Sequence, residues 1–471
     1  MLPLSKTSFK SKKNSFKIEI PMDSEENNFL ASHRKWFLLF FPLAWSGHTG
    51  LGLALGVFGP TQPYIAKNVS TSVDTINFIW TGRSIGFCIT AIIAALMFRK
   101  YLPTRSQKLC FLAFAEIITG IFVMITPFVY SFPLLIAMVS VYGMGLGLFD
   151  TADNSLIVYM LGPNKSRPFT QSLHAFVGVG FIIGSFLVQP FLPSESDENS
   201  TVCPGVEEKN ATVGNEYVPS LMGGIASINW PFIIIGVWHF LTAAGMIILG
   251  FSGIEMPRYY SNNTEDKNQD PAPFTNVKFW KILLIMIYFY YVFSCGLEGF
   301  FQSMTYTYGL CGPLEMTTKE AAMLNSLYFG AFVFGRSSGI FISKYIEPTK
   351  MILASLSGCI TSAILLSILA ATSKIGLYIG TFLMGFSVSF QFASGISWTA
   401  GLFNITGKAS FIFFLGGYTG FLSIPPIAGA IFTADESKVG FFYLALGITL
   451  SQMILFIAMM IISRFKNTNQ K

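Results

Sequence analysis

Twelve long apolar runs divide the chain, and each is long enough to cross a lipid bilayer as a helix. A helix needs about 20 apolar residues to cross a hydrocarbon core roughly 30 Å thick. Each run must be helical, because lipid offers no partner for the open backbone groups of a strand. The sequence therefore predicts an all-α membrane protein with twelve transmembrane helices near residues 36–58, 76–98, 109–130, 132–158, 169–191, 231–252, 279–303, 320–343, 350–371, 375–399, 409–432 and 439–462.

The composition excludes a water-soluble fold. Of the 471 residues, 52% are hydrophobic and only 11% are charged, whereas a soluble domain has about 25% charged residues. The net charge of +6 would by itself suggest a nucleic-acid partner, but the positions of the basic residues explain it better. The six cysteines lack the spacing of a zinc or redox site. We therefore expect no nucleic-acid partner, no bound metal and no catalytic residue.

Lysine and arginine residues indicate how the chain lies in the membrane. With the N-terminus inside, the predicted cytoplasmic segments hold 23 of the 30 basic residues and the outer loops hold five, while Arg83 and Arg336 lie inside spans. Cytoplasmic loops of membrane proteins are enriched in Lys and Arg. We therefore expect both termini in the cytoplasm, for a multi-pass protein of the plasma membrane.

The spans form two halves around a polar linker. Residues 77–82 (NFIWTG) resemble residues 325–330 (NSLYFG), which indicates a duplication. Two related six-helix halves are the organisation of major facilitator carriers, so we predict two pseudo-symmetric six-helix bundles. The predicted segments are a basic cytoplasmic tail at 1–35, an N-terminal bundle at 36–252, a cytoplasmic linker at 253–277, a C-terminal bundle at 278–463 and a cytoplasmic tail at 464–471.

The longest outer loop, residues 192–229, carries signals of an extracellular environment. It is acidic and contains Asn-x-Thr/Ser sequons at Asn199 and Asn210, so we expect glycosylation at both. Cys203 in this loop and Cys311 in another outer loop either pair in an oxidising space or remain two separate thiols.

A few ionisable residues lie inside the predicted spans. A charge within the bilayer is costly unless it is paired or hydrated, so each is a candidate for function. These are Arg83, Asp150, Asp153, His174, Glu298 and Arg336, and uncharged polarity is added by His48, Gln62, Asn154, Gln171, Gln302, Asn325 and Gln391.

The densest polar group lies in the fourth span. Asp150 and Asn154 are four residues apart and share one helix face, with Asp153 on its flank. Carboxylates and an amide match the hydroxyls of a sugar, which donate and accept hydrogen bonds, and they also match a coupling cation. The alternative is a structural ion pair between these aspartates and Arg336.

Depth along the helices, at a rise of about 1.5 Å per residue, predicts two networks. Asp150, His174 and Arg336 fall toward the cytoplasm, and Arg83 and Glu298 fall toward the outside. Structural arginines and an ordinary hydrogen-bonded histidine are the alternatives. Rings inside the spans, such as Trp45, Trp80 and Trp398, offer faces on which a sugar can stack. We expect substrate contacts from Asp150, Asn154, Glu298, Gln302, Gln391 and Trp398, and coupling or gating by Asp150, Asp153, His174, Arg83 and Arg336.

Several stretches together resemble a known family. They are residues 56–61 (GVFGPT), 141–154 (VYGMGLGLFDTADN), 171–174 (QSLH), 296–298 (GLE) and 335–336 (GR). The pattern is similar to the major facilitator proteins called sodium-dependent glucose transporter 1 and domain-containing protein 4, and more distantly to the bacterial fucose–proton symporter.

The resemblance implies a major facilitator fold, monosaccharide transport and ion coupling. In the fucose carrier, an acidic residue at the position that matches Asp150 takes part in coupling. The acid that this carrier has in its first helix has no match in residues 59–62 (GPTQ). Relatives typically have two glycines where this chain has Ala152 and Asp153, so the charge of Asp153 is an addition.

The sequence thus predicts a secondary active transporter of a glucose-like hexose that is coupled to Na⁺ or H⁺ and binds the sugar between its halves. We expect a monomer in membrane lipid with no enzyme activity and no cofactor. Two alternatives stay open at this point. One is a carrier of another small solute, such as an organic anion or urea, and the other is a non-transporting protein of the same fold that escorts or regulates a partner.

Overall fold

The structure is a computed structural model that describes residues 32–192, 221–222, 225–258, 277–343, 345–402 and 407–468. These residues are helical apart from turns and two short antiparallel strands, β1 (Leu221–Met222) and β2 (Ile225–Ala226). Cys311 is disulfide-bonded. Cys203, for which pairing with Cys311 and a separate thiol are the two predicted alternatives, lies outside the described residues, as do the sequons at Asn199 and Asn210 and most of the predicted linker.

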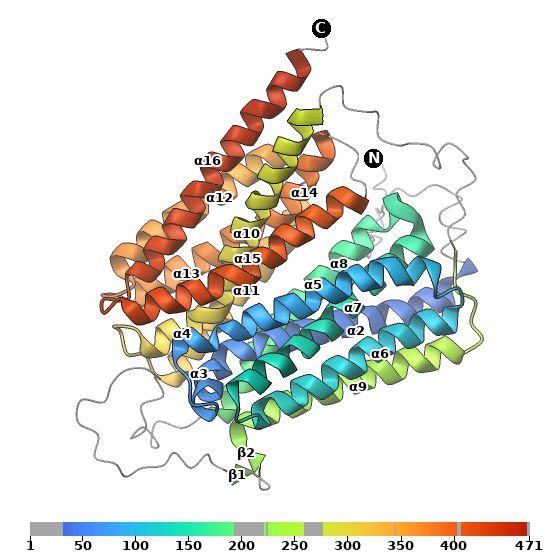
Figure 1. Cartoon of the computed structure of the whole chain (residues 1–471), viewed down its shortest axis with the longest axis horizontal. Helices are drawn as coiled ribbons and strands as arrows, with labels where there is room; N and C mark the ends of the chain where they lie inside the picture. Colours follow the sequence, from blue (N-terminus) through green and yellow to red (C-terminus); the bar gives the residue numbers. More distant parts are fainter. Residues whose placement is uncertain are drawn as a thin grey trace, which may run out of the picture.

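The helices form two bundles that lie side by side (Figure 1). The N-terminal bundle consists of α2 (Arg34–Gly56), α3 (Phe58–Asn68), α4 (Val73–Ile76), α5 (Phe78–Lys100), α6 (Arg105–Ile125), α7 (Phe132–Lys165), α8 (Arg167–Val188) and α9 (Trp230–Phe251). The C-terminal bundle consists of α10 (Val277–Cys311), α11 (Thr318–Ile342), α12 (Pro348–Leu369), α13 (Lys374–Val388), α14 (Gln391–Leu402), α15 (Gly407–Ala434) and α16 (Gly440–Thr468).

Within the described residues, ten helical segments are long and apolar enough to cross a membrane. Two of the predicted spans do not meet that measure. The apolar part of α5, Phe78–Ala94, is shorter, and α11 carries Lys319, Glu320 and Arg336 within its length. Both are nevertheless helical and pack within their bundles, so the predicted all-α architecture of two six-helix bundles is confirmed.

Two predicted spans are interrupted. The first continues beyond Gly56 as α3, and the tenth breaks between the end of α13 at Val388 and the start of α14 at Gln391. At the second break, the Ser355 hydroxyl donates a hydrogen bond of 2.7 Å to the carbonyl oxygen of Ser387. Because the break lies inside protein, a neighbouring helix supplies the partner that lipid cannot.

Glycines set the close packing of α2 against α8. A Cβ added at Gly52 would overlap the Val177 carbonyl oxygen, and one added at Gly180 would overlap the Thr49 carbonyl oxygen. Small residues let two helix backbones approach closely in a membrane. This contact fixes the rotation of α2, and with it the direction of the polar side chains that α2 carries.

We expect Gly52→Ala to destabilise the protein by about 1–3 kcal/mol, because the new methyl group meets backbone that cannot move alone. Gly447→Ala in α16 is the matched control, since a Cβ there has no neighbour within 4 Å. Thermal unfolding of the purified protein in detergent measures both. Equal unfolding temperatures for the two variants would show that the α2–α8 contact is not tight.

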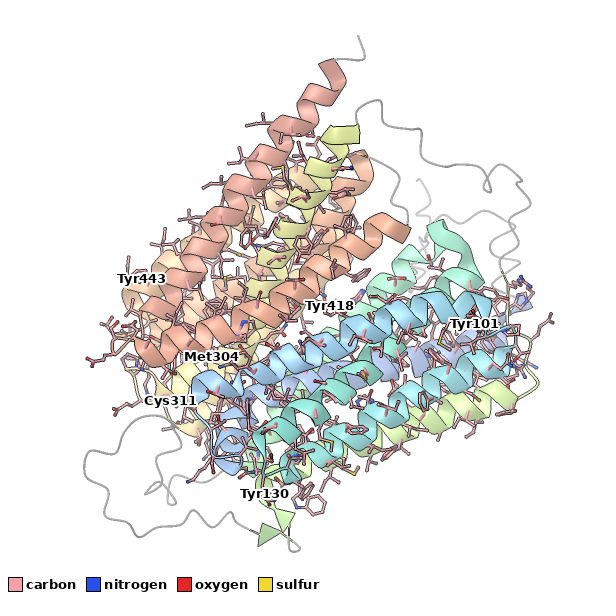
Figure 2. All side chains as sticks on the ribbon, in the orientation of Figure 1. Tyr101, Tyr130, Met304, Cys311, Tyr418 and Tyr443 are labelled. Carbon is pink, nitrogen blue, oxygen red and sulfur yellow. The ribbon has the colours of Figure 1, made fainter. Side chains whose placement is uncertain are left out.

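The bundles converge at one end and splay at the end where α2 begins and α16 ends (Figure 1). Figure 2 shows Met304 near the converging end and Tyr418 farther along the interface. Side-chain hydrogen bonds between the bundles link Asn77 to Met304, Thr81 to Leu422, Ser185 to Asn325 and Gln189 to Ser326. If the termini are cytoplasmic, as the sequence predicts, this arrangement is closed to the outside.

Candidate functional site

The polar side chains of the N-terminal bundle gather around His48 of α2. His48 Nε2 lies 3.4 Å from Asp150 Oδ1, and His48 Nδ1 lies 3.6 Å from Asp153 Oδ2. The Nδ1 atom is also 2.9 Å from the carbonyl oxygen of Ala44. Asn154 donates a hydrogen bond of 3.2 Å to Asp150 Oδ1. These contacts join α2 to α7, and we call His48, Asp150, Asp153 and Asn154 the His48 cluster.

The two carboxylates of the His48 cluster differ in exposure: one is accessible and the other is fully buried. The Asp150 side chain is 13% exposed, whereas the side chains of His48 and Asp153 are 0% exposed. Neither carboxylate oxygen of Asp153 has a hydrogen-bond partner. A buried carboxylate without donors is costly unless a nearby positive charge compensates it. His48 is placed to supply that charge.

The polar side chains of the C-terminal bundle gather around Glu298 of α10. Arg336 of α11 places Nη2 3.6 Å from Glu298 Oε2, and Gln302 donates a hydrogen bond of 2.9 Å to Oε1. The side chains of Glu298 and Arg336 are 11% and 26% exposed. We call Glu298, Gln302 and Arg336 the Glu298 cluster. The charged side chains of Glu298 and Arg336 are therefore partly accessible to a solute.

The prediction that Arg336 shares a network with Asp150 and His174, and not with Glu298, is wrong in one respect. Arg336 forms its ion pair with Glu298 of its own bundle, whereas Asp150 pairs with His48. Depth along a helix does not tell which way a side chain points, and the neighbouring helix supplies the nearest partner. His174 of α8 does lie beside the His48 cluster, with its ring 6.5 Å from that of His48.

Arg83 of α5 links the two bundles. Its guanidinium lies 4.7 Å from the ring centre of Trp80 and 5.4 Å from that of Phe421 on α15. One turn farther along α5, the ring of Phe87 lies 4.1 Å from that of Tyr418. Cation–π contacts of this kind stabilise a buried arginine. Arg83 therefore lies at the interface between the bundles.

Helices α8 and α11 meet across this interface. A Cβ added at Gly178 of α8 would lie 2.5 Å from Val333 Cγ2 of α11. His174 lies one turn before Gly178, and Arg336 lies three residues after Val333. The His48 cluster and the Glu298 cluster therefore lie on the two sides of one interface between the bundles.

Gln391 does not contact the Glu298 cluster. It is buried inside the C-terminal bundle, where its amide nitrogen donates to the Cys359 sulfur and its amide oxygen accepts a hydrogen bond of 3.0 Å from Gln452 on α16. Both polar ends are therefore already used. The prediction of a substrate contact at Gln391 is not supported by this placement.

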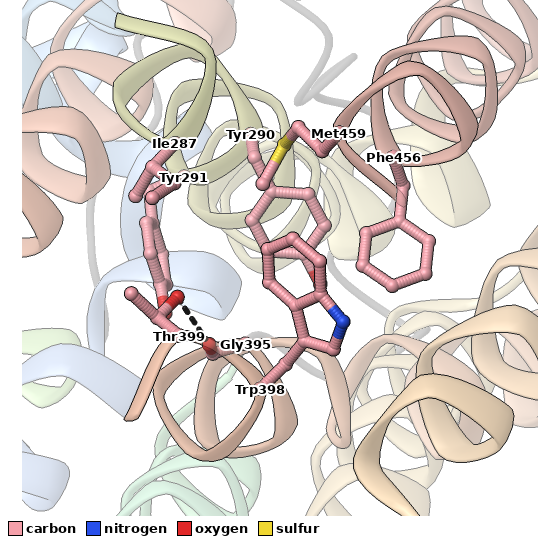
Figure 3. A pocket seen from close by; sticks show the side chains of 8 residues that line it. All are labelled: Ile287, Tyr290, Tyr291, Gly395, Trp398, Thr399, Phe456 and Met459. Atoms are coloured by element: carbon pink, nitrogen blue, oxygen red, sulfur yellow. Dashed lines mark hydrogen bonds between the residues drawn. The ribbon is translucent and has the colours of Figure 1, made fainter. Parts of the chain in front are cut away.

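Trp398 also packs inside the C-terminal bundle. Figure 3 shows its indole among Tyr290, Tyr291, Phe456 and Met459, which come from α10 and α16. The Trp398 and Phe456 ring centres are 5.3 Å apart. The side chains leave no room for a water molecule. A sugar cannot enter such a space, so the predicted role of Trp398 as a wall for substrate needs correction.

The structure contains one buried ion pair that was not among the residues predicted from the sequence. Glu116 of α6 and His239 of α9 place Oε2 and Nδ1 2.6 Å apart, and both side chains are almost fully buried. Both residues lie inside predicted spans, so the criterion that identified Asp150 also identifies them. The pair lies against α2, since a Cβ added at Gly47 would be 2.9 Å from Glu116 Oε1.

Comparison with known proteins agrees with this architecture. No family model matches the chain. It is 27% identical over 411 residues to the Homo sapiens protein named sodium-dependent glucose transporter 1, covering 86% of this chain and 76% of that protein. It is 22% identical over 458 residues to the Xenopus tropicalis protein named major facilitator superfamily domain-containing protein 4A, covering 87% and 88% of the two chains.

Solved transporter structures share the fold. The nucleoside transporter NupG aligns with a TM-score of 0.61 and 12% identity over 89% of this chain and 99% of its own. A bacterial homolog of the human lysosomal transporter Spinster, in an inward-facing and occupied conformation, aligns with a TM-score of 0.59 and 15% identity over 93% and 96% of the two chains. At these identities the likeness shows the fold alone.

A further relative establishes the family. The Xenopus laevis protein named sodium-dependent glucose transporter 1 is 30% identical to this chain over 380 residues, covering 80% of this chain and 72% of that protein. The relatives and the structural neighbours are membrane transporters and not enzymes. The chain therefore belongs to the family of major facilitator transporters that includes sodium-dependent glucose transporter 1 and major facilitator superfamily domain-containing protein 4.

Proposed function

We propose that this chain transports a glucose-like monosaccharide across the plasma membrane and couples the transport to a gradient of Na⁺ or H⁺. The names of its relatives support both the sugar and a coupling cation. The two-bundle fold supports alternating access, in which one bundle rocks against the other around a central site.

The observation that carries this proposal is the presence of accessible charged atoms in both bundles at one interface. Asp150 of the N-terminal bundle is partly exposed, and so are Glu298 and Arg336 of the C-terminal bundle. A sugar hydroxyl donates to a carboxylate and accepts from a guanidinium or an amide. A sugar between the bundles would therefore bridge the His48 cluster and the Glu298 cluster.

Aromatic rings beside the His48 cluster support a sugar as the substrate. Trp45 stacks on Phe176 of α8 at 5.0 Å and donates a hydrogen bond to the Ser172 hydroxyl. A cavity of about 270 Å³ lies at the N-terminal end of α2, lined partly by Phe37, Phe41 and Trp45. Sugars present apolar C–H faces, and such rings offer flat surfaces for them.

Uptake of labelled hexose into proteoliposomes tests the proposal, with sodium and pH gradients imposed separately. We expect gradient-driven accumulation in the wild type and a loss of at least 90% of it in Asp150→Asn, because that change removes the accessible charge of the His48 cluster. Asp435→Asn is the control, since Asp435 lies between α15 and α16 and accepts hydrogen bonds from Ser437 and from Gly440 N at the start of α16.

The outcomes separate the parts of the proposal. Equal gradient-driven accumulation in Asp150→Asn and wild type would remove the coupling role of Asp150. Absence of hexose flux in wild type would remove the sugar assignment, and labelled organic anions and urea in the same vesicles would then identify a different solute. Flux of none of these solutes would favour a non-transporting role.

A further inference from the structure

The placement of one imidazole between two carboxylates has a direct consequence for coupling. We infer that His48, held between Asp150 and Asp153, is the proton-binding group of this transporter and that its coupled cation is H⁺. This inference rests on the proposed transport function and deepens it. It departs from the sodium that the names of the relatives specify.

The imidazole occupies the place that a metal cation would need. Hard cations are bound by several oxygen ligands that surround them. Here the His48 ring lies between the carboxylates, with one nitrogen 3.4 Å from Asp150 and the other 3.6 Å from Asp153. A proton needs only the ring itself.

The hydrogen bonds of His48 define where the proton enters. Nδ1 lies 2.9 Å from the Ala44 carbonyl oxygen, which can only accept, so Nδ1 carries a hydrogen in either charge state. The free position of the neutral ring is then Nε2, which has no hydrogen-bond partner and faces Asp150. Since Asp150 is the exposed member of the cluster, a proton reaches Nε2 by way of its carboxylate and leaves by the same path.

Asp153 explains why His48 can carry a positive charge inside the helix bundle. Its two oxygens are buried and have no donor. When His48 is protonated, the imidazolium compensates this carboxylate through the Nδ1 side of the ring. When His48 is neutral, Asp153 is left without a compensating charge. Proton occupancy of His48 therefore changes the net charge of the cluster, of which Asp150 is the exposed member.

The other titratable groups around His48 come from the helices packed against α2. His174 of α8 lies nearest, with its ring nearly perpendicular to that of His48. Glu116 of α6 and His239 of α9 pair with each other. His174 is therefore the titratable neighbour that lies between His48 and the helix α11 that carries Arg336, since α8 packs against α11 at Gly178 and Val333.

The test uses the full-length protein in proteoliposomes with the membrane potential clamped at zero. Hexose counterflow, measured without an ion gradient, reports the proposed function alone. A pH gradient of one unit and a ten-fold sodium gradient are then imposed in separate experiments, each of which permits up to about ten-fold accumulation with one cation per sugar. We expect several-fold accumulation with the pH gradient and none with the sodium gradient.

Two variants probe the site itself. We expect His48→Gln and Asp153→Asn to bring pH-driven accumulation to the equilibrium ratio, and to reduce it at least ten-fold more than they reduce counterflow. Glu116→Gln/His239→Gln is the control, because it also removes a buried histidine of the same bundle, together with the carboxylate that pairs with it. It should retain pH-driven accumulation.

Each outcome decides one proposal. Accumulation driven by sodium and not by pH, or pH-driven accumulation that survives in His48→Gln, would overturn the proton inference while counterflow still upholds sugar transport. Absence of counterflow in wild type would instead overturn the proposed function. If a variant fails to fold, the comparison of the two gradients in wild type still decides between H⁺ and Na⁺.

Discussion

Arg336→Met is expected to reduce hexose uptake to less than a tenth of the wild-type rate. The change removes the guanidinium that lies 3.6 Å from the Glu298 carboxylate and leaves that carboxylate largely buried without a cation. Breaking a fully buried pair costs about 3–5 kcal/mol, and the residual exposure of Arg336 places the expected loss at about 1–3 kcal/mol. Uptake and thermal unfolding of the same preparation measure the two effects.

The double variant Glu298→Gln/Arg336→Met separates stability from transport. Because it removes both charges, we expect it to recover most of the lost stability and none of the uptake. Lys374→Met is the matched control. It breaks an ion pair with Glu320 that is short, 2.7 Å, but lies exposed at the starts of α11 and α13. We expect it to change stability by less than about 1 kcal/mol and to leave uptake unchanged.

A wild-type rate and unfolding temperature in Arg336→Met would contradict this prediction. Recovery of uptake in the double variant would contradict the expectation that transport needs the Arg336 guanidinium. It would show that the arginine serves only to neutralise Glu298, which is a structural role.

Local features of the fold and site could be predicted from the sequence. Lipid imposes helices on long apolar runs, so the order of the spans follows from hydropathy alone. The four-residue spacing of Asp150 and Asn154 predicts one shared face, and Asn154 does donate to Asp150. These features depend on a single helix, whose geometry is the same in every protein.

Partners on other helices could not be predicted, because they depend on how each helix is rotated in its bundle. The rotation of α2 is set by glycine contacts such as Gly52 against Val177, and it places His48 against Asp150. Sequence spacing carries no signal for that pairing. Sequence spacing likewise does not indicate that Arg336 pairs with Glu298 of α10 and not with a residue of the other bundle.

The misplaced residues Gln391 and Trp398 have a common cause. Both lie in α14, beyond the break that separates it from α13 at Val388. An unbroken helix would continue the face set by α13, but residues after the break follow a new direction and pack toward α16. Residues 385–395 contain no proline that would mark this interruption in the sequence.

The converging end of the molecule allows a direct test of rocking. The Asn325 amide donates a hydrogen bond of 2.6 Å to the Ser185 hydroxyl, which joins α11 to α8. We expect Ser185→Cys/Asn325→Cys, once cross-linked by an oxidant or a short thiol-reactive linker, to lose more than 90% of hexose uptake. Alternating access requires these helices to separate when the site opens to the opposite side.

Reversal by a reducing agent is the decisive measurement. If uptake returns when the link is broken, the loss comes from the restraint and not from the substitutions. The single variants Ser185→Cys and Asn325→Cys are the controls, because each can react only with the free native cysteines Cys88, Cys110, Cys295 and Cys359 among the described residues. Unchanged uptake in the fully cross-linked protein would mean that α8 and α11 never part at this point, and that the solute passes without the bundles rocking about the His48 and Glu298 clusters.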